Sequence, residues 1–379
     1  MDAAGLYIHV PFCTAICPYC DYAVLIAGEE RRAGYVAALL EEMELAGSDR
    51  WRFDTVYLGG GTPSALATTR LAQVVGAVRA RMALTDDVRL HLEVNPEDVT
   101  VEAARAWREL GVGFVSLGVQ SLDDGALRFL GRAHGARRAR QAFQVLREVG
   151  FDTVSIDLMY GFEGQDAAGW QDQLEAAAAL APDHLSCYQL TFHQGTVFGR
   201  RLARGVLAEL DPEIQAELFR LTHRRLADLG YEAYEVSSFA AREAHRSRHN
   251  LKYWTHAPYL GLGPSAHSFD GSSRWWNLAK LRLWQTALER GQRPLAGEEA
   301  LSPSELALES VMLGLRITEG IDLARLRARC GVDLVASNRA LVERLCDSGL
   351  VVVEGDRLRP TLEGLAVADS LAREFELSE

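Results

Sequence analysis

Residues 7–22 read YIHVPFCTAICPYCDY and place Cys13, Cys17 and Cys20 within eight residues of the chain. Three thiolates at this spacing are expected to converge on one metal centre. A closed zinc site or an iron–sulfur cube takes four protein ligands, so the triplet leaves one coordination position for a group that is not a cysteine. Two structural alternatives stay open: a zinc ion with His9 or His91 as fourth ligand, and a disulfide between two of the three cysteines.

The composition is that of a folded globular protein: 379 residues, 48% hydrophobic and 24% charged. Its length suits a barrel of moderate size with an appended module. The formal charge of −12 argues against a nucleic-acid partner, which needs a surplus of Lys and Arg on some face. No stretch has the apolar length of a membrane span and no signal peptide is recognisable, so we expect a cytoplasmic protein without an integral membrane segment.

Short apolar runs alternate with amphipathic helical patterns through the first half of the chain. The runs predict six strands, over residues 6–10, 55–58, 89–94, 114–118, 153–158 and 184–190. Apolar residues at three- and four-residue steps predict helices over residues 33–46, 68–82, 101–110, 137–149 and 168–180. This alternation predicts an α/β fold with a parallel sheet, in the form of a partial (β/α)6 barrel whose active face lies at the carboxyl ends of its strands.

The pattern divides the chain into three parts. Residues 1–210 are expected to form the partial barrel. Residues 211–300 begin with a long helix over 213–229, continue into an aromatic-rich loop region over 239–276, and are expected to close the open side of the barrel. Residues 301–379 read as three helices, a two-stranded turn and a last helix, which predicts a C-terminal winged-helix-like module with a packing or lid role.

Polar residues end several predicted strands. A carboxylate left unpaired in a strand that is covered on both faces costs several kcal/mol, so Glu93 and Asp157 need buried polar partners. Ribose hydroxyls or an ammonium group of a ligand would serve, and so would an internal ion pair with Arg or Lys. Glycines 59, 60 and 61 and then Thr62 follow the second strand, where they allow a ligand to approach the backbone, although an ordinary turn would use similar residues.

The cysteine triplet, with Tyr19 directly before its third cysteine, resembles the signature of the radical S-adenosylmethionine (SAM) superfamily. The resemblance implies that Cys13, Cys17 and Cys20 hold a 4Fe-4S cluster whose fourth iron is chelated by SAM. Arg132 is a planar donor suited to the SAM carboxylate, unless it is a solvated surface charge. The residues that the resemblance assigns to SAM or cluster binding, besides the cysteines, are Tyr7, Tyr19, Gly60, Gly61, Thr62, Glu93, Gln120, Arg132 and Asp157.

Phrases spread over nearly the entire chain resemble the coproporphyrinogen dehydrogenase (HemN) group. Among them are Gly-Val-Gln-Ser-Leu at 118–122 and Leu-Gly-Arg-Ala-His at 130–134. Within that group the chain resembles the HemW family of heme chaperones. Cys13 comes almost at the start, and Tyr22 stands where the dehydrogenase has a further cysteine. Residues 249–254, His-Asn-Leu-Lys-Tyr-Trp, match the His-Asn-x-x-Tyr-Trp motif of HemW.

This second resemblance implies a heme site. His249 would ligate the heme iron, and Tyr253 and Trp254 would offer flat apolar faces to the macrocycle. A lone histidine beside aromatic residues is also a common structural residue, and His267 in a glycine-rich loop supplies a second imidazole. The family further implies apo-hemoproteins as recipients of the heme and a homodimer. The alternative function is an oxygen-independent coproporphyrinogen III dehydrogenase, or another radical SAM enzyme acting on a tetrapyrrole.

Overall fold

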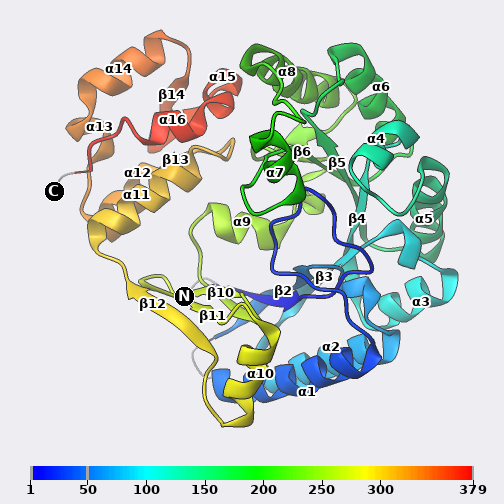
Figure 1. The fold of residues 1–379 in the computed structure, drawn as a ribbon. Coiled ribbons are helices and arrows are strands. Elements are labelled where there is room, and N and C mark those ends of the chain that lie inside the picture. The colour runs from blue at the N-terminus through cyan, green and yellow to red at the C-terminus, as the bar shows by residue number, and fades with distance from the viewer. Residues whose placement is uncertain (1–2, 48–50, 378–379) are drawn as a thin grey trace.

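One mixed sheet runs through most of the computed structural model, which describes residues 3–47 and 51–377 (Figure 1). Its central six strands are parallel, and each pairs with the next along the chain. They are β1 (Ala4–Val10), β2 (Phe53–Gly60), β3 (Leu84–Val94), β4 (Val112–Gln120), β5 (Thr153–Tyr160) and β6 (His184–Gln189). The six predicted strands are therefore confirmed, at nearly the predicted positions.

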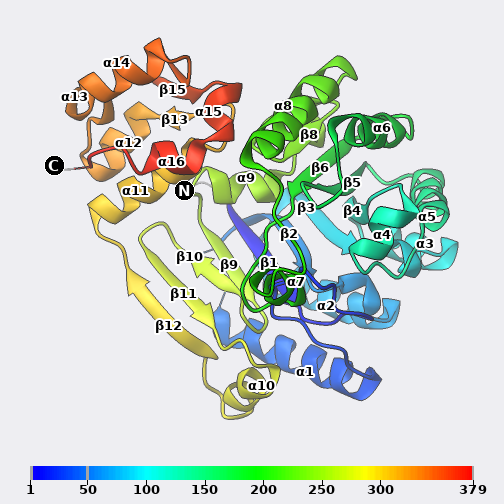
Figure 2. The same ribbon diagram turned by 45° about the horizontal axis from the view of Figure 1, so that its top comes forward.

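Helices connect these strands and cover the outer side of the sheet (Figures 1 and 2). The five predicted helices are α1 (Glu29–Ala46), α2 (Thr68–Arg81), α3 (Val101–Glu109), α5 (Ala136–Val149) and α6 (Ala167–Ala178). Two short helices were not predicted from the sequence, α4 (Asp124–Phe129) and α7 (Val197–Ala203). Both lie in the connections that leave the carboxyl ends of strands β4 and β6, so they belong to the same rim as the cysteine segment.

Alternate residues of the six strands point to opposite sides of the sheet. The outward set, such as Leu6, Ile8 and Val10 of β1, packs with the helices in one large hydrophobic core. The inward set is polar or aromatic, because an incomplete barrel leaves a lumen for a ligand instead of filling it with apolar side chains. This inward set includes Tyr7, His9, Thr55, Tyr57, His91, Glu93, Ser116, Asp157 and Ser186.

The region that follows the six βα units extends the sheet at both of its ends. After α8 (Pro212–Asp228), the strands β7 (Glu232–Ala233) and β8 (Ser238–Ala240) pair beyond β6, while β9 (Tyr259–Leu262) pairs in parallel with β1 on the opposite side. The sheet continues from β9 through β10 (His267–Phe269) and β11 (Ser273–Asn277) to β12 (Leu295–Ala300). Helix α10 (Leu281–Glu289) connects β11 to β12. The expectation of loops over 239–276 was therefore wrong. A Cβ at Gly261 would strike the His267 backbone carbonyl, so glycine lets β9 and β10 approach each other.

Helix α9 (Arg248–Trp254) lies between the two ends of the sheet and packs against β1, β2 and α11 (Figure 1). Residues from α11 onward build a second, smaller core. Its elements are α11 (Pro303–Gly314), β13 (Ile321–Asp322), α12 (Leu323–Cys330), α13 (Leu334–Ser337), α14 (Arg339–Asp347), β14 (Val351–Glu354), β15 (Arg357–Pro360), α15 (Leu362–Ala366) and α16 (Ala368–Ala372). Four helices precede the β14–β15 turn where three were predicted, and two short helices follow it where one was predicted. Strand β13 adds a third strand to this small sheet.

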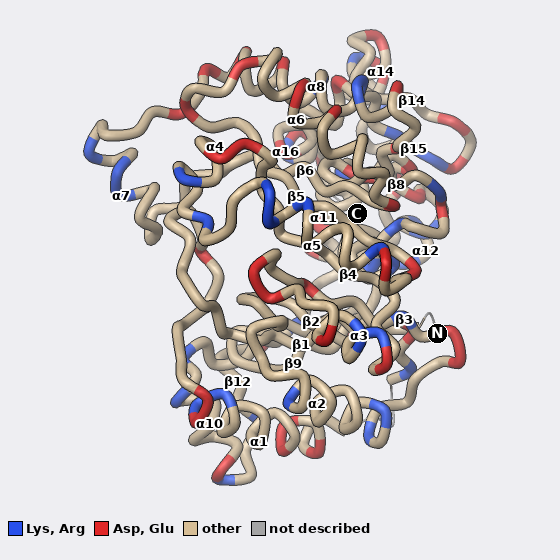
Figure 3. The backbone as a smooth tube through the Cα atoms, turned by 90° about the vertical axis from the view of Figure 1, so that its right-hand side faces the viewer, with Lys and Arg blue, Asp and Glu red and all other residues tan. Residues whose placement is uncertain are grey.

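The surface carries both signs of charge. On the face shown in Figure 3, Lys and Arg are interspersed with Asp and Glu along the helices. Helix α7 carries a short basic stretch that includes Arg200 and Arg201. No helix in the described part of the chain is both long enough and apolar enough to cross a bilayer.

Candidate functional site

The three cysteines lie on the loop between β1 and α1, at the carboxyl end of the first strand. The loop is closed at its base, because the Cys13 amide donates to the Leu25 carbonyl at 3.1 Å and the Leu25 amide donates to the Pro11 carbonyl at 2.7 Å. All six cysteines of the chain carry free thiols, so the disulfide alternative is not seen. Cys13 is buried, and Cys17 and Cys20 are half-buried.

The three thiols line one cavity of about 170 Å³, which we call the cysteine cavity. It also collects most of the residues that the sequence assigned to cofactor binding, from five different strands or strand ends. The predicted residues that line it are Cys13, Cys17, Tyr19, Cys20, Gly60, Gly61, Thr62, Glu93, Gln120, Arg132 and Asp157. The parallel strands of the barrel thus bring together side chains that are more than 140 residues apart in sequence.

The glycine turn after β2 wraps closely around the first strand. A Cβ at Gly61 would lie 2.8 Å from the carbonyl oxygens of Val10 and Phe12, and Gly60 has a φ of 106° with its missing Cβ directed at the His9 ring. Both positions therefore require glycine. The Thr62 hydroxyl donates to the Cys13 sulfur at 3.5 Å, which fixes this turn against the cysteine loop.

Glu93 and Asp157 stand on the inner wall of the cavity with neutral partners. Glu93 accepts from the Tyr57 hydroxyl at 2.7 Å and from the Gly60 amide at 3.0 Å, and Asp157 accepts from the Ser116 hydroxyl at 2.7 Å. Burial raises the pKa of Glu93 to about 7 and that of Asp157 to about 6. Neither carboxyl forms an ion pair within the described part of the chain, so the alternative of an internal Arg or Lys partner is not seen.

Arg132 is half-buried in the wall of the cysteine cavity and donates hydrogen bonds to three groups. Its guanidinium donates to the Cys17 sulfur at 3.3 Å, to Asn95 Oδ1 at 2.7 Å and to the Gly118 carbonyl at 3.0 Å. Its Nε is buried without a hydrogen-bond partner among the described residues, so one strong donor is left for a ligand. Arg132 is thus a site residue and not a solvated surface charge.

The remaining predicted residues, Tyr7, His249, Tyr253 and Trp254, line a second cavity of about 400 Å³ beside the first. We call it the tyrosine cavity, because its wall consists mainly of Tyr7, Tyr22, Tyr57, Tyr188, Tyr253 and Trp254. It shares Tyr22, Gly60 and Glu93 with the cysteine cavity. The two groups of predicted residues therefore form neighbouring compartments of one site.

His249 is a buried residue of this wall. Its Nδ1 lies 2.9 Å from the Thr55 hydroxyl, its Nε2 lies 2.9 Å from the Tyr253 hydroxyl, and its ring stacks on Tyr57 with centroids 5.0 Å apart. Burial lowers the pKa of His249 to about 3, so the ring is neutral. Both ring nitrogens are thus already in hydrogen bonds, and the ring is only 1% exposed.

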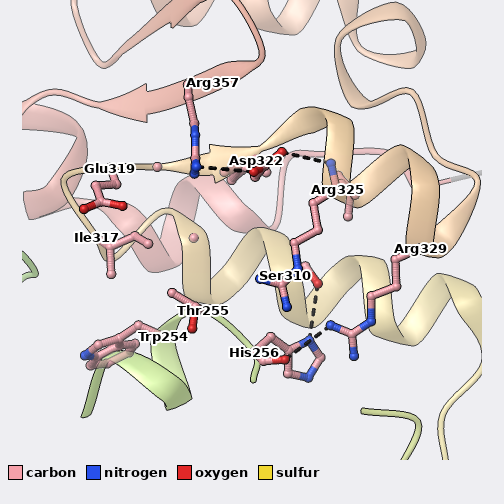
Figure 4. Close-up of a pocket in the computed structure, with 14 residues that line it drawn as sticks. Trp254, Thr255, His256, Ser310, Ile317, Glu319, Asp322, Arg325, Arg329 and Arg357 are labelled. Atoms are coloured by element: carbon pink, nitrogen blue, oxygen red, sulfur yellow. Dashed lines mark hydrogen bonds and ion pairs between the residues drawn. The ribbon is translucent and has the colours of Figure 1, made fainter. Parts of the chain in front are cut away.

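Trp254 also reaches a third cavity, of about 130 Å³, between the end of α9 and the C-terminal module (Figure 4). The guanidinium of Arg316 lies 6.0 Å from the centre of the Trp254 ring. On the same wall the His256 ring stacks on Phe269 at 4.3 Å, with Nε2 3.0 Å from Glu309. The last residue of the His-Asn-x-x-Tyr-Trp motif therefore contacts both the tyrosine cavity and the C-terminal module.

Sequence reasoning missed several residues of the cysteine cavity. Asn95 donates to the Thr62 hydroxyl at 3.1 Å and accepts from Arg132, and Ser116 holds Asp157. Ser116 had a usable signal, since it is a polar residue two positions after Phe114 in an otherwise apolar strand. Tyr22 had none, because its importance comes from the folding of the loop: it is 64% exposed and still borders both the cysteine and the tyrosine cavities.

Comparisons with protein families match two parts of the chain. The model of the radical SAM superfamily matches residues 7–177, and the model of the HemN C-terminal domain matches residues 301–367. The first range contains every residue found around the cysteine cavity. The second range covers most of the C-terminal module.

Individual proteins resemble the chain over nearly its full length. It is 37% identical over 374 residues to "Heme chaperone HemW" of Mycobacterium tuberculosis, covering 97% of this chain and 94% of that protein. It is 30% identical to the protein of the same name from Bacillus subtilis, covering 91% and 92%. The mitochondrial radical S-adenosyl methionine domain-containing protein 1 of Bos taurus is 34% identical, covering 97% and 86%.

Among solved structures, coproporphyrinogen III oxidase (HemN) from Escherichia coli superposes with a TM-score of 0.82 over 98% of this chain and 89% of that one. The sequence identity is 22%, so this similarity concerns the fold alone. It confirms the predicted partial α/β barrel.

Proposed function

Because the chain belongs to the HemW family of heme chaperones, within the radical SAM superfamily, we propose that it binds heme beside a SAM-liganded 4Fe-4S cluster and delivers the heme to apo-hemoproteins. The observation that supports this most directly is the pair of neighbouring compartments. One is lined by three free thiols, and the other by aromatic side chains that suit a flat macrocycle.

The cysteine cavity fits a cluster that carries SAM. Cys13, Cys17 and Cys20 would hold three irons, and burial keeps the pKa of the free Cys20 thiol high, at about 11, so metal binding must displace its proton. The chemistry that a cluster held by these residues would supply is transfer of an electron to the sulfonium group of SAM. The protein itself provides Glu93 and the Gly60–Gly61 backbone for an ammonium group, and the unpaired Nε of Arg132 for a carboxylate.

Asp157 completes the polar set at this end of the barrel. Its carboxylate accepts hydrogen bonds from the Ser116 hydroxyl and, at 3.4 Å, from the Ser155 hydroxyl. Each carboxylate oxygen has a second lone pair, which can accept from a ribose hydroxyl. Gln120 beside it has a φ of 65°, an unusual backbone conformation for a residue other than glycine. Strain of this kind persists where the surrounding structure enforces it, commonly at ligand sites.

The tyrosine cavity is proposed to take part in heme binding through Tyr253 and Trp254. No Lys or Arg lines it, and its acidic groups are Glu93 and Glu235, whose pKa values burial raises to about 7. The anionic propionates of a heme would therefore face away from this cavity, toward solvent or a recipient protein. A homodimer, expected from the family resemblance, belongs to the same proposal.

Anaerobic reconstitution tests the proposal in two steps. Iron and sulfide analysis should give one 4Fe-4S cluster per chain, and Cys17→Ala should abolish it. Ferric heme should then bind the reconstituted protein and pass to an apo-hemoprotein, with the rise of the recipient's absorption as readout. A protein that binds no heme, or keeps it in the presence of the recipient, would contradict the chaperone function.

Product analysis separates the alternative function. Consumption of coproporphyrinogen III coupled to formation of 5′-deoxyadenosine would favour a dehydrogenase. SAM cleavage that stays uncoupled from any tetrapyrrole would leave the chaperone proposal in place.

A further inference from the structure

A further compartment adjoins the tyrosine cavity. It has a volume of about 530 Å³ and lies at the junction of the cysteine loop, the end of β6 and the β9–β10 turn. We call it the histidine cavity, after His9, His193 and His267 in its wall. The His9 ring is buried, and its two nitrogens lie 3.1 Å from the Tyr7 hydroxyl and from the Ala23 carbonyl. The volume of the cavity lies in the range of ordinary ligand pockets, which is roughly 300–1,000 Å³. It shares Tyr7, Tyr22 and Tyr253 with the tyrosine cavity, so one flat ligand can contact both.

An iron ligand needs an imidazole nitrogen that is accessible and free. His249 offers neither, since both of its nitrogens are in hydrogen bonds and it is 1% exposed. To bind iron, it would have to leave the Thr55 or the Tyr253 hydroxyl. Leaving that buried polar group unpaired is unfavourable.

His267 offers both. It is the first residue of β10 and is exposed, and neither ring nitrogen has a hydrogen-bond partner among the described residues. Its ring nevertheless has a defined plane, because it stacks on Trp276 of β11 with centroids 5.9 Å apart and an angle of 21°. A free but oriented imidazole is the arrangement that axial ligation requires.

The backbone before His267 is built to hold this position. Ser265 adopts a φ of 64°, and Gly263 has a φ of 98° with its missing Cβ 2.5 Å from the His9 carbonyl oxygen. The Glu42 carboxylate accepts from the Gly263 amide at 2.7 Å and so ties this turn to helix α1. The turn that carries His267 is therefore strained and anchored at several points, as expected for a functional loop.

We propose that His267 ligates the iron of a heme held in the histidine cavity, and that His249 is a positioning residue that fixes Tyr253 against the macrocycle. The inference rests on the proposed heme binding and names the site of that binding. His193 also lines the cavity, but its Nε2 lies 3.5 Å from the Asp21 carboxylate of the cysteine loop.

The test compares ferric heme with iron-free protoporphyrin IX on the full, reconstituted protein. In His267→Ala we expect the histidine-ligated absorption and paramagnetic resonance signals to vanish and heme affinity to fall by roughly tenfold, as for loss of a metal-site residue. Affinity for protoporphyrin IX should not change, because it has no iron to ligate. Added imidazole should restore the ligated spectrum of His267→Ala. His249→Ala serves as the matched control, because it also removes one histidine. It should keep the ligated spectrum.

The outcomes separate the two proposals. A wild-type protein that binds no heme overturns the proposed function and this inference with it. A wild-type protein that binds heme, with an unchanged spectrum in His267→Ala, overturns only the assignment of His267. The assignment of His267 is also overturned if His267→Ala keeps the ligated signal while His193→Ala, or a folded His249→Ala, loses it.

Discussion

Nε2 of His249 lies 2.9 Å from the hydroxyl oxygen of Tyr253, one helical turn further along α9. The two residues are the first and fifth of the His-Asn-x-x-Tyr-Trp motif, and the contact gives them different roles. The imidazole is buried behind the tyrosine, and the tyrosine ring borders both the tyrosine cavity and the histidine cavity. This geometry supports the proposal that His249 positions the aromatic wall formed by Tyr253 and Trp254.

Replacing His249 by Ala is therefore expected to act first on stability. The change removes two hydrogen bonds and a stacked ring from a buried site and leaves the Thr55 hydroxyl without its partner. We expect the free energy of unfolding to fall by about 2–4 kcal/mol, measured by urea denaturation of the apo-protein. Tyr253→Phe, which removes one hydroxyl and keeps the ring, should cost about 1 kcal/mol. Equal effects of the two changes would contradict a supporting role for the imidazole.

Gly60 is expected to tolerate no side chain. Its φ of 106° is unfavourable for other residues, and a Cβ would strike the His9 ring. Gly60→Ala should abolish SAM binding, measured by equilibrium dialysis on the reconstituted protein, and lower stability by about 2–3 kcal/mol.

Gly76→Ala is the matched control for this change. Gly76 lies within helix α2, and a Cβ there meets no atom within 4 Å. Alanine should raise stability by about 0.5–1 kcal/mol at this position, because it favours the helix, and SAM binding should not change. Loss of SAM binding in Gly76→Ala would show that the assay reports general damage.

Arg132→Lys keeps the charge and removes the planar geometry. A lysine cannot contact Cys17, Asn95 and the Gly118 carbonyl together, nor present a further N–H group toward a ligand. We expect SAM affinity to fall by about 10- to 100-fold and the reduction potential of the cluster to shift, since a hydrogen bond to a ligating sulfur is lost. Arg128→Lys, at an exposed position on α4, should alter neither quantity. An unchanged affinity in Arg132→Lys would remove Arg132 from the SAM site.

Most of the barrel and of the cysteine cavity could be predicted from the sequence, because both depend on short-range signals. The strands are apolar runs bounded by clear turn residues. In a parallel sheet the carboxyl ends of the strands lie at the same edge, so the residues that follow each strand come together there. The cysteine spacing and the glycine turn are local patterns of the same kind.

The second half of the site could not be predicted in this way. Strand β9 pairs with β1, which lies far away in the sequence, and β10 pairs with β9 and β11. No local sequence pattern reveals the pairing of β9 with β1. The state of His249 was also hidden, since its partner Thr55 is 194 residues away. An imidazole that binds iron and one that is fully hydrogen-bonded look the same in sequence, and only their neighbours distinguish them.

Glu93 should make the stability of the apo-protein depend on pH. Burial raises its pKa from the ordinary 4.5 to about 7, so between these values the folded state holds a proton that the unfolded state has lost. Stability should therefore fall as pH rises from about 5 to about 7, and Glu93→Gln, which is neutral throughout, should remove roughly 1–3 kcal/mol of that fall. Urea denaturation at pH 5 and pH 8 measures the difference. Glu42 and Glu235, also raised to about 7, contribute a slope of their own that the variant keeps.

The same group should make SAM binding depend on pH in the opposite direction. An ammonium group beside Glu93 favours the carboxylate, so wild-type affinity for SAM should rise as pH increases through about 7. Glu93→Gln should bind SAM more weakly and with a flatter pH profile, while Glu109→Gln, at an exposed position ending α3, should behave as the wild type. If the affinity of Glu93→Gln keeps the wild-type profile, the ammonium group is held elsewhere, and the glycine turn alone must account for the position of SAM.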